Sequence, residues 1–141
     1  MLPDPFKAAA DDDEERVSNN RFNKALKSVL EDVGGNTFFV CATNLSHVGP
    51  QFGEPRKVDD QRRFDVEKHD REMLGKFLEG DAEEFIGAIK WSKNPTRWLG
   101  VGCMASTLEV AGASNLELID YRQAYDEAGS QLVSTASIAL F

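Results

Sequence analysis

The sequence lacks the features that mark membrane proteins, disulfide-rich secreted domains and nucleic-acid-binding proteins. Its longest candidate apolar segment, residues 132–141, is ten residues long, whereas a membrane-spanning helix needs about 20. The two cysteines, Cys41 and Cys103, are too few for a disulfide framework and too far apart for a CxxC redox or zinc motif. Sixteen basic residues against 24 acidic ones give a net charge of −8, which disfavours phosphate-rich partners. We therefore expect neither a membrane nor a nucleic-acid partner.

The N-terminal segment is acidic and poor in apolar side chains. Its first 16 residues carry six acidic and two basic side chains, a local net charge of −4. They show neither the basic nor the apolar region of a signal peptide, so we expect a cytoplasmic location. The sequence predicts a mobile arm over residues 1–17 and one folded unit over residues 18–141.

Hydrophobic periodicity and turn residues divide the folded unit into helices and strands. Helices are predicted over residues 18–33, 59–79, 82–91 and 103–111, and strands over 37–42, 115–121 and 132–141. This order predicts an α/β fold, a partial three-layer sandwich in which helices flank a small mixed sheet. Three strands form a thin sheet for so much apolar helix surface, so the fold looks incomplete.

The first predicted strand, residues 37–42, is a continuous apolar run of the kind found in strands buried on both faces of a parallel sheet. It leads directly into residues 43–50, where polar side chains and then Gly49 and Pro50 end the strand. Ligands of open α/β sheets bind just beyond the carboxyl ends of strands. We therefore expect the chemistry of the protein at this position.

Three segments carry a resemblance to a known family. Residues 38–53, FFVCATNLSHVGPQFG, are similar to a strand followed by an Asp-Leu-Ser-His-x-Gly-Pro-x-Phe-Gly loop. Residues 97–105 are similar to an Arg-Ile-Cys-Gly-x-Gly-Pro-Ile-Ala segment, and residues 116–121 and 133–141 to the family's last strands. The chain thus resembles the C-terminal half of the Memo-like family, the B component of the AmmeMemoRadiSam group. That family is related in fold to the class III extradiol ring-cleaving dioxygenases.

The resemblance implies a metal pocket from which this chain departs. The family builds it from two histidines of its N-terminal half, the Asp and His of the Asp-Leu-Ser-His loop, and the Cys of the Arg-x-Cys-Gly loop. The His falls on His47, but the Asp falls on Asn44 and the Cys on Leu99. Non-haem iron sites need two imidazoles and a carboxylate, whereas Asn44 supplies no charge and Leu99 no lone pair. We expect no cofactor, or iron or copper where a partner half supplies the other ligands.

Several residues around this pocket have alternative interpretations. His47 is a remaining metal ligand, a general base, or a strand-end histidine bonded to nearby backbone. Ser46, Leu99, Gly100 and Cys103 are expected to line the pocket. Because Cys103 follows a Gly-x-Gly turn at a predicted helix N-terminus, it has the setting of a redox-reactive thiol.

Three further residues have simpler structural interpretations. Asn44 has the character of a turn former that bonds its own backbone. Cys41 lies in an apolar run and is expected to be a small buried hydrophobe. His69 lies in a charged stretch and is expected on a solvated helix surface.

Two functions of different classes follow from the sequence. The first is a truncated, degenerate Memo-like protein without catalytic metal chemistry. It would act as a binding or assembly module that forms homo-oligomers or pairs with a separately encoded N-terminal half. The alternative is an enzyme, the C-terminal half of a split or longer metal-dependent dioxygenase-like oxidoreductase in which His47 is a pocket ligand.

Overall fold

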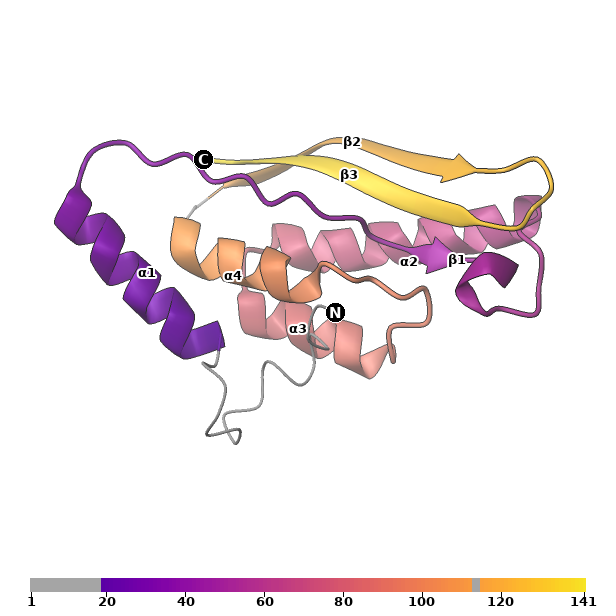
Figure 1. The fold of residues 1–141 in the computed structure, drawn as a ribbon, viewed down its shortest axis with the longest axis horizontal. Helices are drawn as coiled ribbons and strands as arrows, with labels where there is room; N and C mark the ends of the chain where they lie inside the picture. The colour runs from indigo at the N-terminus through magenta and orange to yellow at the C-terminus, as the bar shows by residue number, and fades with distance from the viewer. Residues whose placement is uncertain (1–18, 113–114) are drawn as a thin grey trace.

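The computed structural model of the protein describes residues 19–112 and 115–141 (Figure 1). Within these ranges the chain forms four α-helices, one short 3-10 helix and three strands. The acidic arm predicted for residues 1–17 lies outside the described residues. In chain order the elements are α1 (Asn19–Val33), β1 (His47–Val48), η1 (Pro50–Phe52), α2 (Asp60–Leu78), α3 (Ala82–Trp91), α4 (Val101–Ala111), β2 (Leu116–Tyr125) and β3 (Leu132–Leu140).

The sheet has the strand order β1-β3-β2, and both strand pairs are antiparallel. β2 and β3 follow one another through a short turn and pair as a hairpin, with Leu116 opposite Leu140. β1 adds two residues to the other edge of β3, where His47 lies opposite Val133. The prediction of a small sheet is confirmed, but the sheet is not mixed. A parallel pair would have required residues 37–42 as a strand, and these residues form none.

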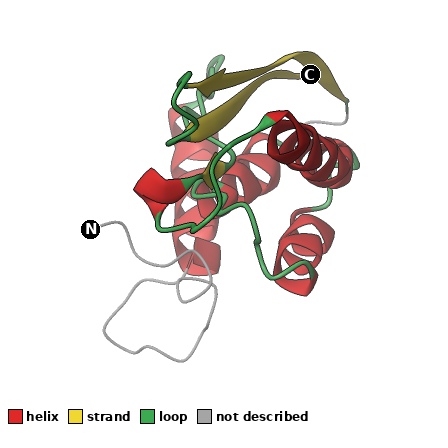
Figure 2. Cartoon of the chain, turned by 90° about the vertical axis from the view of Figure 1, so that its right-hand side faces the viewer, coloured by secondary structure: helices red, strands yellow, loops and turns green. Residues whose placement is uncertain are grey.

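Helices α2, α3 and α4 lie on the same side of this sheet, with α3 farther from it and packed against α2 and α4 (Figures 1 and 2). Along most of β2 the side chains alternate between half-buried and exposed positions, as expected for a sheet covered on one face. No helix of the described residues covers the outer face. The α/β class is confirmed, and one helical layer on one sheet is part of a sandwich.

The core lies between these helices and the inner face of the sheet. Phe77 of α2 and Phe85 of α3 meet edge to face, with ring centroids 5.3 Å apart. Trp98, in the loop before α4, lies beside Phe85 with ring centroids 6.2 Å apart. The buried set is completed by Leu45, Met73, Leu74, Ala82, Ile89, Val101, Met104, Ala105 and Leu108.

The helices α2 and α3 begin at the caps that their sequences predict. The Asp59 carboxylate accepts the backbone N–H of Arg62 at 2.7 Å, and that of Asp81 accepts the N–H of Glu84 at 2.9 Å. The left-handed Gly80 lies between the two helices. Capping aspartates and this glycine therefore fix where the α2–α3 hairpin turns.

The segment over residues 37–42 differs from its prediction, because it is a loop and not a buried strand. It runs beside β3 (Figure 1), but no backbone hydrogen bond joins these six described residues to that strand. Phe38 is 90% exposed and Val40 is 76% exposed. Because this apolar segment pairs with no described strand, two of its large side chains remain in solvent.

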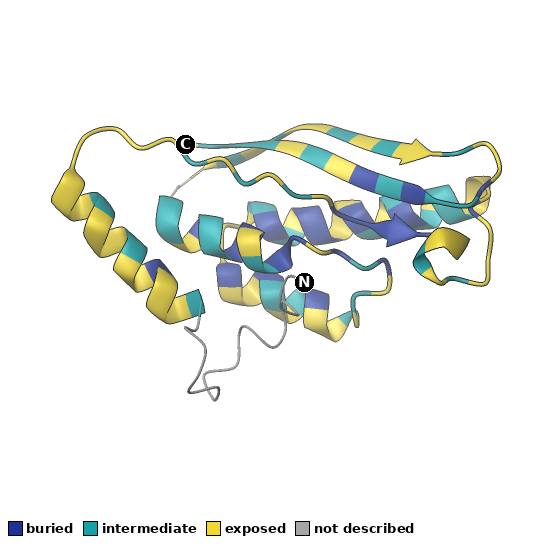
Figure 3. Ribbon diagram, viewed as in Figure 1, coloured by how far each residue is buried: buried dark blue, intermediate teal, exposed yellow. Residues whose placement is uncertain are grey.

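Helix α1 is confirmed, but its apolar stripe is not buried (Figure 3). Phe22 and Val29 are each 55% exposed and Val33 is 77% exposed. The buried residue of α1 is Asn23, whose amide donates to the Glu109 carboxylate of α4 at 2.6 Å. A polar contact therefore holds this helix, while the stripe that would normally face a core stays open.

No helix in the described part of the chain combines the length and the apolar character that crossing a membrane requires.

Candidate functional site

His47 lies in the short strand β1, at the end of the loop that follows α1. Its side chain is 8% exposed, and Nδ1 lies 3.1 Å from the carbonyl oxygen of Leu45. Because a carbonyl oxygen only accepts, this contact places a proton on Nδ1, and in a neutral imidazole the free lone pair is then on Nε2. The ring also packs edge to face on Phe52, with centroids 5.3 Å apart. This is the strand-end histidine bonded to nearby backbone, with one ring nitrogen still available.

An open groove of about 890 Å³ brings three of the predicted site residues together. Asn44, His47 and Leu99 all line it. The walls come from the loop before β1, from α2 and α4, and from β3. The other lining residues are mostly apolar: Phe38, Phe39, Val40, Cys41, Ala42, Thr43, Leu45, Phe77, Met104, Thr107, Ala136, Ser137, Ile138 and Leu140.

The donor atoms around His47 do not fit the family's metal centre. Asn44 offers a neutral amide, and Leu99, which is 62% exposed, offers no lone pair. Among residues 19–112 and 115–141, no group of three or more His, Cys, Asp or Glu side chains could hold a metal ion. A non-haem iron site takes two imidazoles and a carboxylate. Of the donors that the resemblance implies, the described residues thus supply His47 and none of the others.

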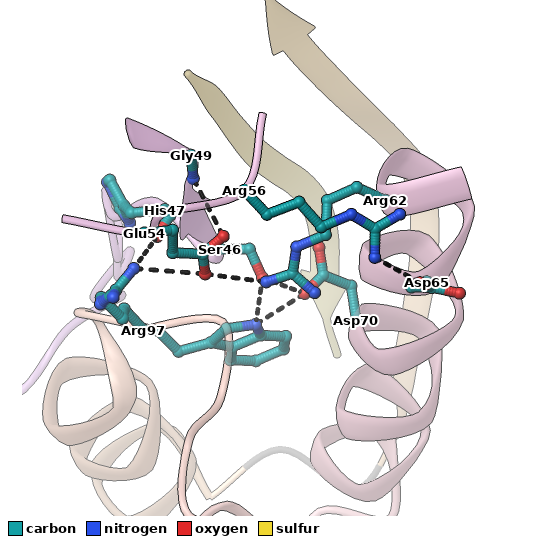
Figure 4. Close-up of polar contacts among 10 residues, drawn as sticks. Ser46, His47, Gly49, Glu54, Arg56, Arg62, Asp65, Asp70 and Arg97 are labelled. Carbon is teal, nitrogen blue, oxygen red and sulfur yellow. Dashed lines mark hydrogen bonds and ion pairs between the residues drawn. The ribbon is translucent and has the colours of Figure 1, made fainter. Parts of the chain in front are cut away.

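Ser46, also predicted for the pocket, instead belongs to a buried polar cluster around Asp70 of α2 (Figure 4). Asp70 and Ser46 are fully buried. The Asp70 carboxylate accepts four hydrogen bonds, from Ser46 Oγ at 2.5 Å, Trp98 Nε1 at 2.7 Å, Tyr121 Oη at 2.8 Å and Ser134 Oγ at 2.5 Å. We call these five residues the Asp70 cluster.

The Asp70 cluster joins the segments that build the groove. Its members come from α2, the end of the loop before β1, the loop before α4, and strands β2 and β3. Hydrogen bonds to a charged acceptor are about twice as strong as neutral ones. Burial, and then the nearby Asp70 carboxylate, raise the pKa of Tyr121, so its hydroxyl stays a donor. The cluster therefore holds these segments together, and its member Ser46 directly precedes His47 in the chain.

The buried position of Asp70 is hidden in the sequence, because Asp70 lies in the charged stretch that also contains His69. Helical spacing does indicate that Asp70 is buried, because Asp70 follows Val66 by four positions and precedes Leu74 by four, which places all three on one face of α2. The interpretation of His69 as fully solvated is also wrong. Its side chain is partly buried, and Nε2 has no hydrogen-bond partner within the part of the chain that the structure describes. Burial lowers the pKa of His69.

A second polar group fixes the turn that follows His47. The Glu54 carboxylate accepts the backbone N–H of Gly49 at 3.2 Å, Arg62 at 2.8 Å and Arg97 at 3.3 Å (Figure 4). Gly49 has φ of 110°, and a Cβ there would lie 2.6 Å from the Ser130 carbonyl oxygen. The short strand β1 ends at this turn, and only glycine fits position 49.

Gly100 and Cys103 lie beside the groove at the start of α4, not among its lining residues. Gly100 presses against Thr43, whose Oγ1 would lie 2.0 Å from a Cβ placed on Gly100. Cys103 is exposed in the first turn of α4, and its Sγ lies 3.0 Å from Sγ of Cys41. Cys41 is half-buried against the core and also faces this second thiol, so its interpretation as a small buried hydrophobe is confirmed only in part.

The chain matches known proteins over most of its length. A family model described as Memo-like protein matches residues 12–139. The MEMO1 family protein TTHA0924 of Thermus thermophilus is 40% identical over 91 residues, which cover 60% of this chain and 24% of that protein. A MEMO1 family protein of Aquifex aeolicus is 28% identical over 119 residues, which cover 82% of this chain and 30% of that protein. The chain thus spans less than a third of either relative. It belongs to the Memo-like protein family.

Proposed function

We propose that this chain is a cytoplasmic binding and assembly module that corresponds to the C-terminal part of the Memo-like fold and has lost the family's metal chemistry. The observation that carries the proposal is the groove beside His47. It keeps the family histidine, but Asn44 and Leu99 stand where the resemblance places a carboxylate and a thiolate. An amide and an aliphatic side chain do not balance the charge of a divalent ion.

The surface of the groove supports binding of another polypeptide. Phe38, Val40 and Leu99 are 90%, 76% and 62% exposed. Burying large apolar side chains such as these stabilises a complex by about 25 cal/mol per Å² of apolar surface. The open stripe on α1, made by Phe22, Val29 and Val33, adds apolar surface on the helix that precedes the groove loop. Large exposed apolar patches mark interaction sites in soluble proteins.

We propose that the groove binds a second polypeptide, one that corresponds to the part of the relatives outside the matched region. The matched segments make up only 24% and 30% of the two relatives. In those relatives much more chain is therefore present to cover the corresponding surface. The uncovered outer face of the sheet is a further place for such polypeptide to pack.

The test is co-expression of this chain with the unmatched region of the Thermus thermophilus relative, followed by co-purification. We expect a one-to-one complex that Phe38→Glu and Leu99→Glu each abolish, because a charge in the groove would be buried without a partner. Trp91→Glu is the matched control, since Trp91 is 91% exposed on α3 and does not line the groove. A stable dimer of this chain without the second polypeptide, or equal binding by all variants, would contradict the proposed occupant.

One observation favours the alternative, an enzyme completed by ligands from the partner. Nδ1 of His47 donates to the Leu45 carbonyl, which leaves Nε2 in the tautomer of a metal-binding imidazole. Iron or copper that binds stoichiometrically to the co-purified complex, and not to its His47→Ala variant, would establish this alternative. If the chain is a binding module, the complex should form equally well with the His47→Ala variant.

A further inference from the structure

Two cysteines that are far apart in the sequence lie side by side in the structure. Cys41 in the loop before β1 and Cys103 in the first turn of α4 are 62 positions apart, and their Sγ atoms are 3.0 Å apart. A disulfide bond is about 2.0 Å long, so the two sulfur atoms need to approach by about 1 Å to form one. Residues 36–43 make no backbone hydrogen bond to another described residue, so few bonds oppose that movement of the loop around Cys41.

The two thiols differ in the way that an attacking and a resolving cysteine differ. Cys103 is exposed in the first turn of α4, so solvent reaches its sulfur directly. Burial, together with a hydrogen bond to Cys103, raises the pKa of Cys41 to about 11. Cys41 therefore stays protonated in the resting protein, with its sulfur already against Cys103 Sγ. An oxidant in solution reaches Cys103 first.

We propose that Cys41 and Cys103 form a reversible intramolecular disulfide by exchange with a small disulfide such as oxidised glutathione. The Cys103 thiolate attacks one sulfur of glutathione disulfide, forms a mixed disulfide and releases one glutathione thiolate. Cys41 then loses its proton to solvent, attacks Cys103 Sγ and releases the second glutathione. The protein loses two electrons and two protons, and with them one glutathione disulfide becomes two glutathione thiols.

The disulfide would fasten one wall of the groove. Residues 38–45 line the groove, and the backbone of this stretch is held at Leu45, whose N–H donates to the Ser134 carbonyl oxygen at 2.9 Å. A bond at Cys41 adds an attachment to α4 four residues earlier. Oxidation would therefore hold Phe38 and Val40 near α4, and reduction would release them. Transient disulfides of this kind act as redox sensors in cytosolic proteins.

The first test treats the full chain with oxidised glutathione and measures free thiols and intact mass. We expect both thiols to disappear with the loss of two hydrogen atoms and no glutathione adduct. Cys41→Ser should stop at the mixed disulfide on Cys103, and Cys103→Ser should react far more slowly at Cys41. A stable adduct on the unsubstituted chain would overturn the proposal. So would a cross-link between chains, seen as a dimer on a non-reducing gel.

The second test asks whether the folded structure brings the thiols together. The equilibrium between the dithiol and the disulfide is measured against glutathione in buffer and in denaturing urea. The folded chain should favour the disulfide by about 100-fold over the unfolded chain, because the fold has already closed the intervening loop. Equal equilibrium constants in the two solvents would contradict the contact on which the proposal rests. This measurement needs no partner, so its result is independent of the proposed function.

Discussion

The indole N–H of Trp98 donates to the Asp70 carboxylate at 2.7 Å, and both side chains are almost completely buried. The same indole also lies 3.1 Å from Ser46 Oγ, which is itself bonded to Asp70. Trp98 immediately precedes Leu99, and Ser46 immediately precedes His47. The two groove segments are therefore positioned by one buried carboxylate, whether or not the groove does any chemistry.

Asp70→Leu removes the carboxylate that accepts all four hydrogen bonds, and so tests how much the Asp70 cluster contributes to stability. We expect the free energy of unfolding to fall by about 3–5 kcal/mol, because buried donors lose a charged partner. Asp70→Asn should cost only about 1–2 kcal/mol. Its amide oxygen still accepts from Trp98, and its N–H groups donate to the hydroxyls of Tyr121 and Ser134, which rotate. Urea unfolding of both variants measures the difference, and equal losses would contradict the four-donor arrangement.

Gly100→Ala tests the close approach between the start of α4 and the groove loop. The added Cβ would lie 2.0 Å from Thr43 Oγ1 and 2.6 Å from Thr43 Cβ, so the loop must shift. We expect a loss of about 1–3 kcal/mol in the free energy of unfolding. In a Thr43→Gly background the same change should cost clearly less, as a double-mutant cycle would measure.

Helical glycines that have open surroundings are matched controls for Gly100→Ala. A Cβ on Gly75 in α2 or on Gly87 in α3 would meet nothing within 4 Å. Gly75→Ala and Gly87→Ala should each raise the free energy of unfolding by about 0.5–1 kcal/mol through helix propensity. If Gly100→Ala were as stabilising as these two changes, the contact with Thr43 would be wrong.

His69 gives a prediction for the pH dependence of stability. Burial lowers its pKa in the folded state, whereas the unfolded side chain titrates near about 6.5. Between these two values the unfolded chain binds more protons, so stability falls as the pH is lowered from about 7 through the folded pKa. His69→Gln should remove this part of the loss in urea unfolding at a series of pH values.

An NMR titration checks the same prediction directly, because the chain has only two histidines, His47 and His69. The His69 ring signal should titrate below about 6.5, and His69→Gln assigns it. A His69 pKa at or above the ordinary value would contradict the burial of its ring.

The sequence predicts those elements whose signals are local. The boundaries of α2 and α3 agree with the structure because Asp59 and Asp81 cap them within one turn. The direction of the sheet depends on distant pairings, so the apolar run over 37–42 suggested a buried strand that does not form. Helical spacing alone places Asp70 on the buried face of α2, but the charged residues around it in the sequence suggested an exposed position. The contact between Cys41 and Cys103 has no local signal, since it depends on how the groove loop packs on α4.

His47 also shows how far the site could be predicted. The resemblance placed it in a pocket with Asn44 and Leu99, and the structure brings these three residues to one groove. The hydrogen bond from its ring to Leu45 is a matter of loop geometry, which a sequence alone does not supply. The sequence alone shows that Asn44 and Leu99 stand at two of the pocket positions that the resemblance implies. It does not show that the groove around them is open and apolar.

The proposed loss of metal binding at His47 is tested most directly by elemental analysis of the purified full chain and its His47→Ala variant. We expect iron, copper and zinc each far below one equivalent per chain, with no difference between the two proteins, because a single imidazole does not retain a divalent ion. Stoichiometric metal in the unsubstituted chain that disappears in His47→Ala would contradict the binding-module function and establish a metal centre at this groove.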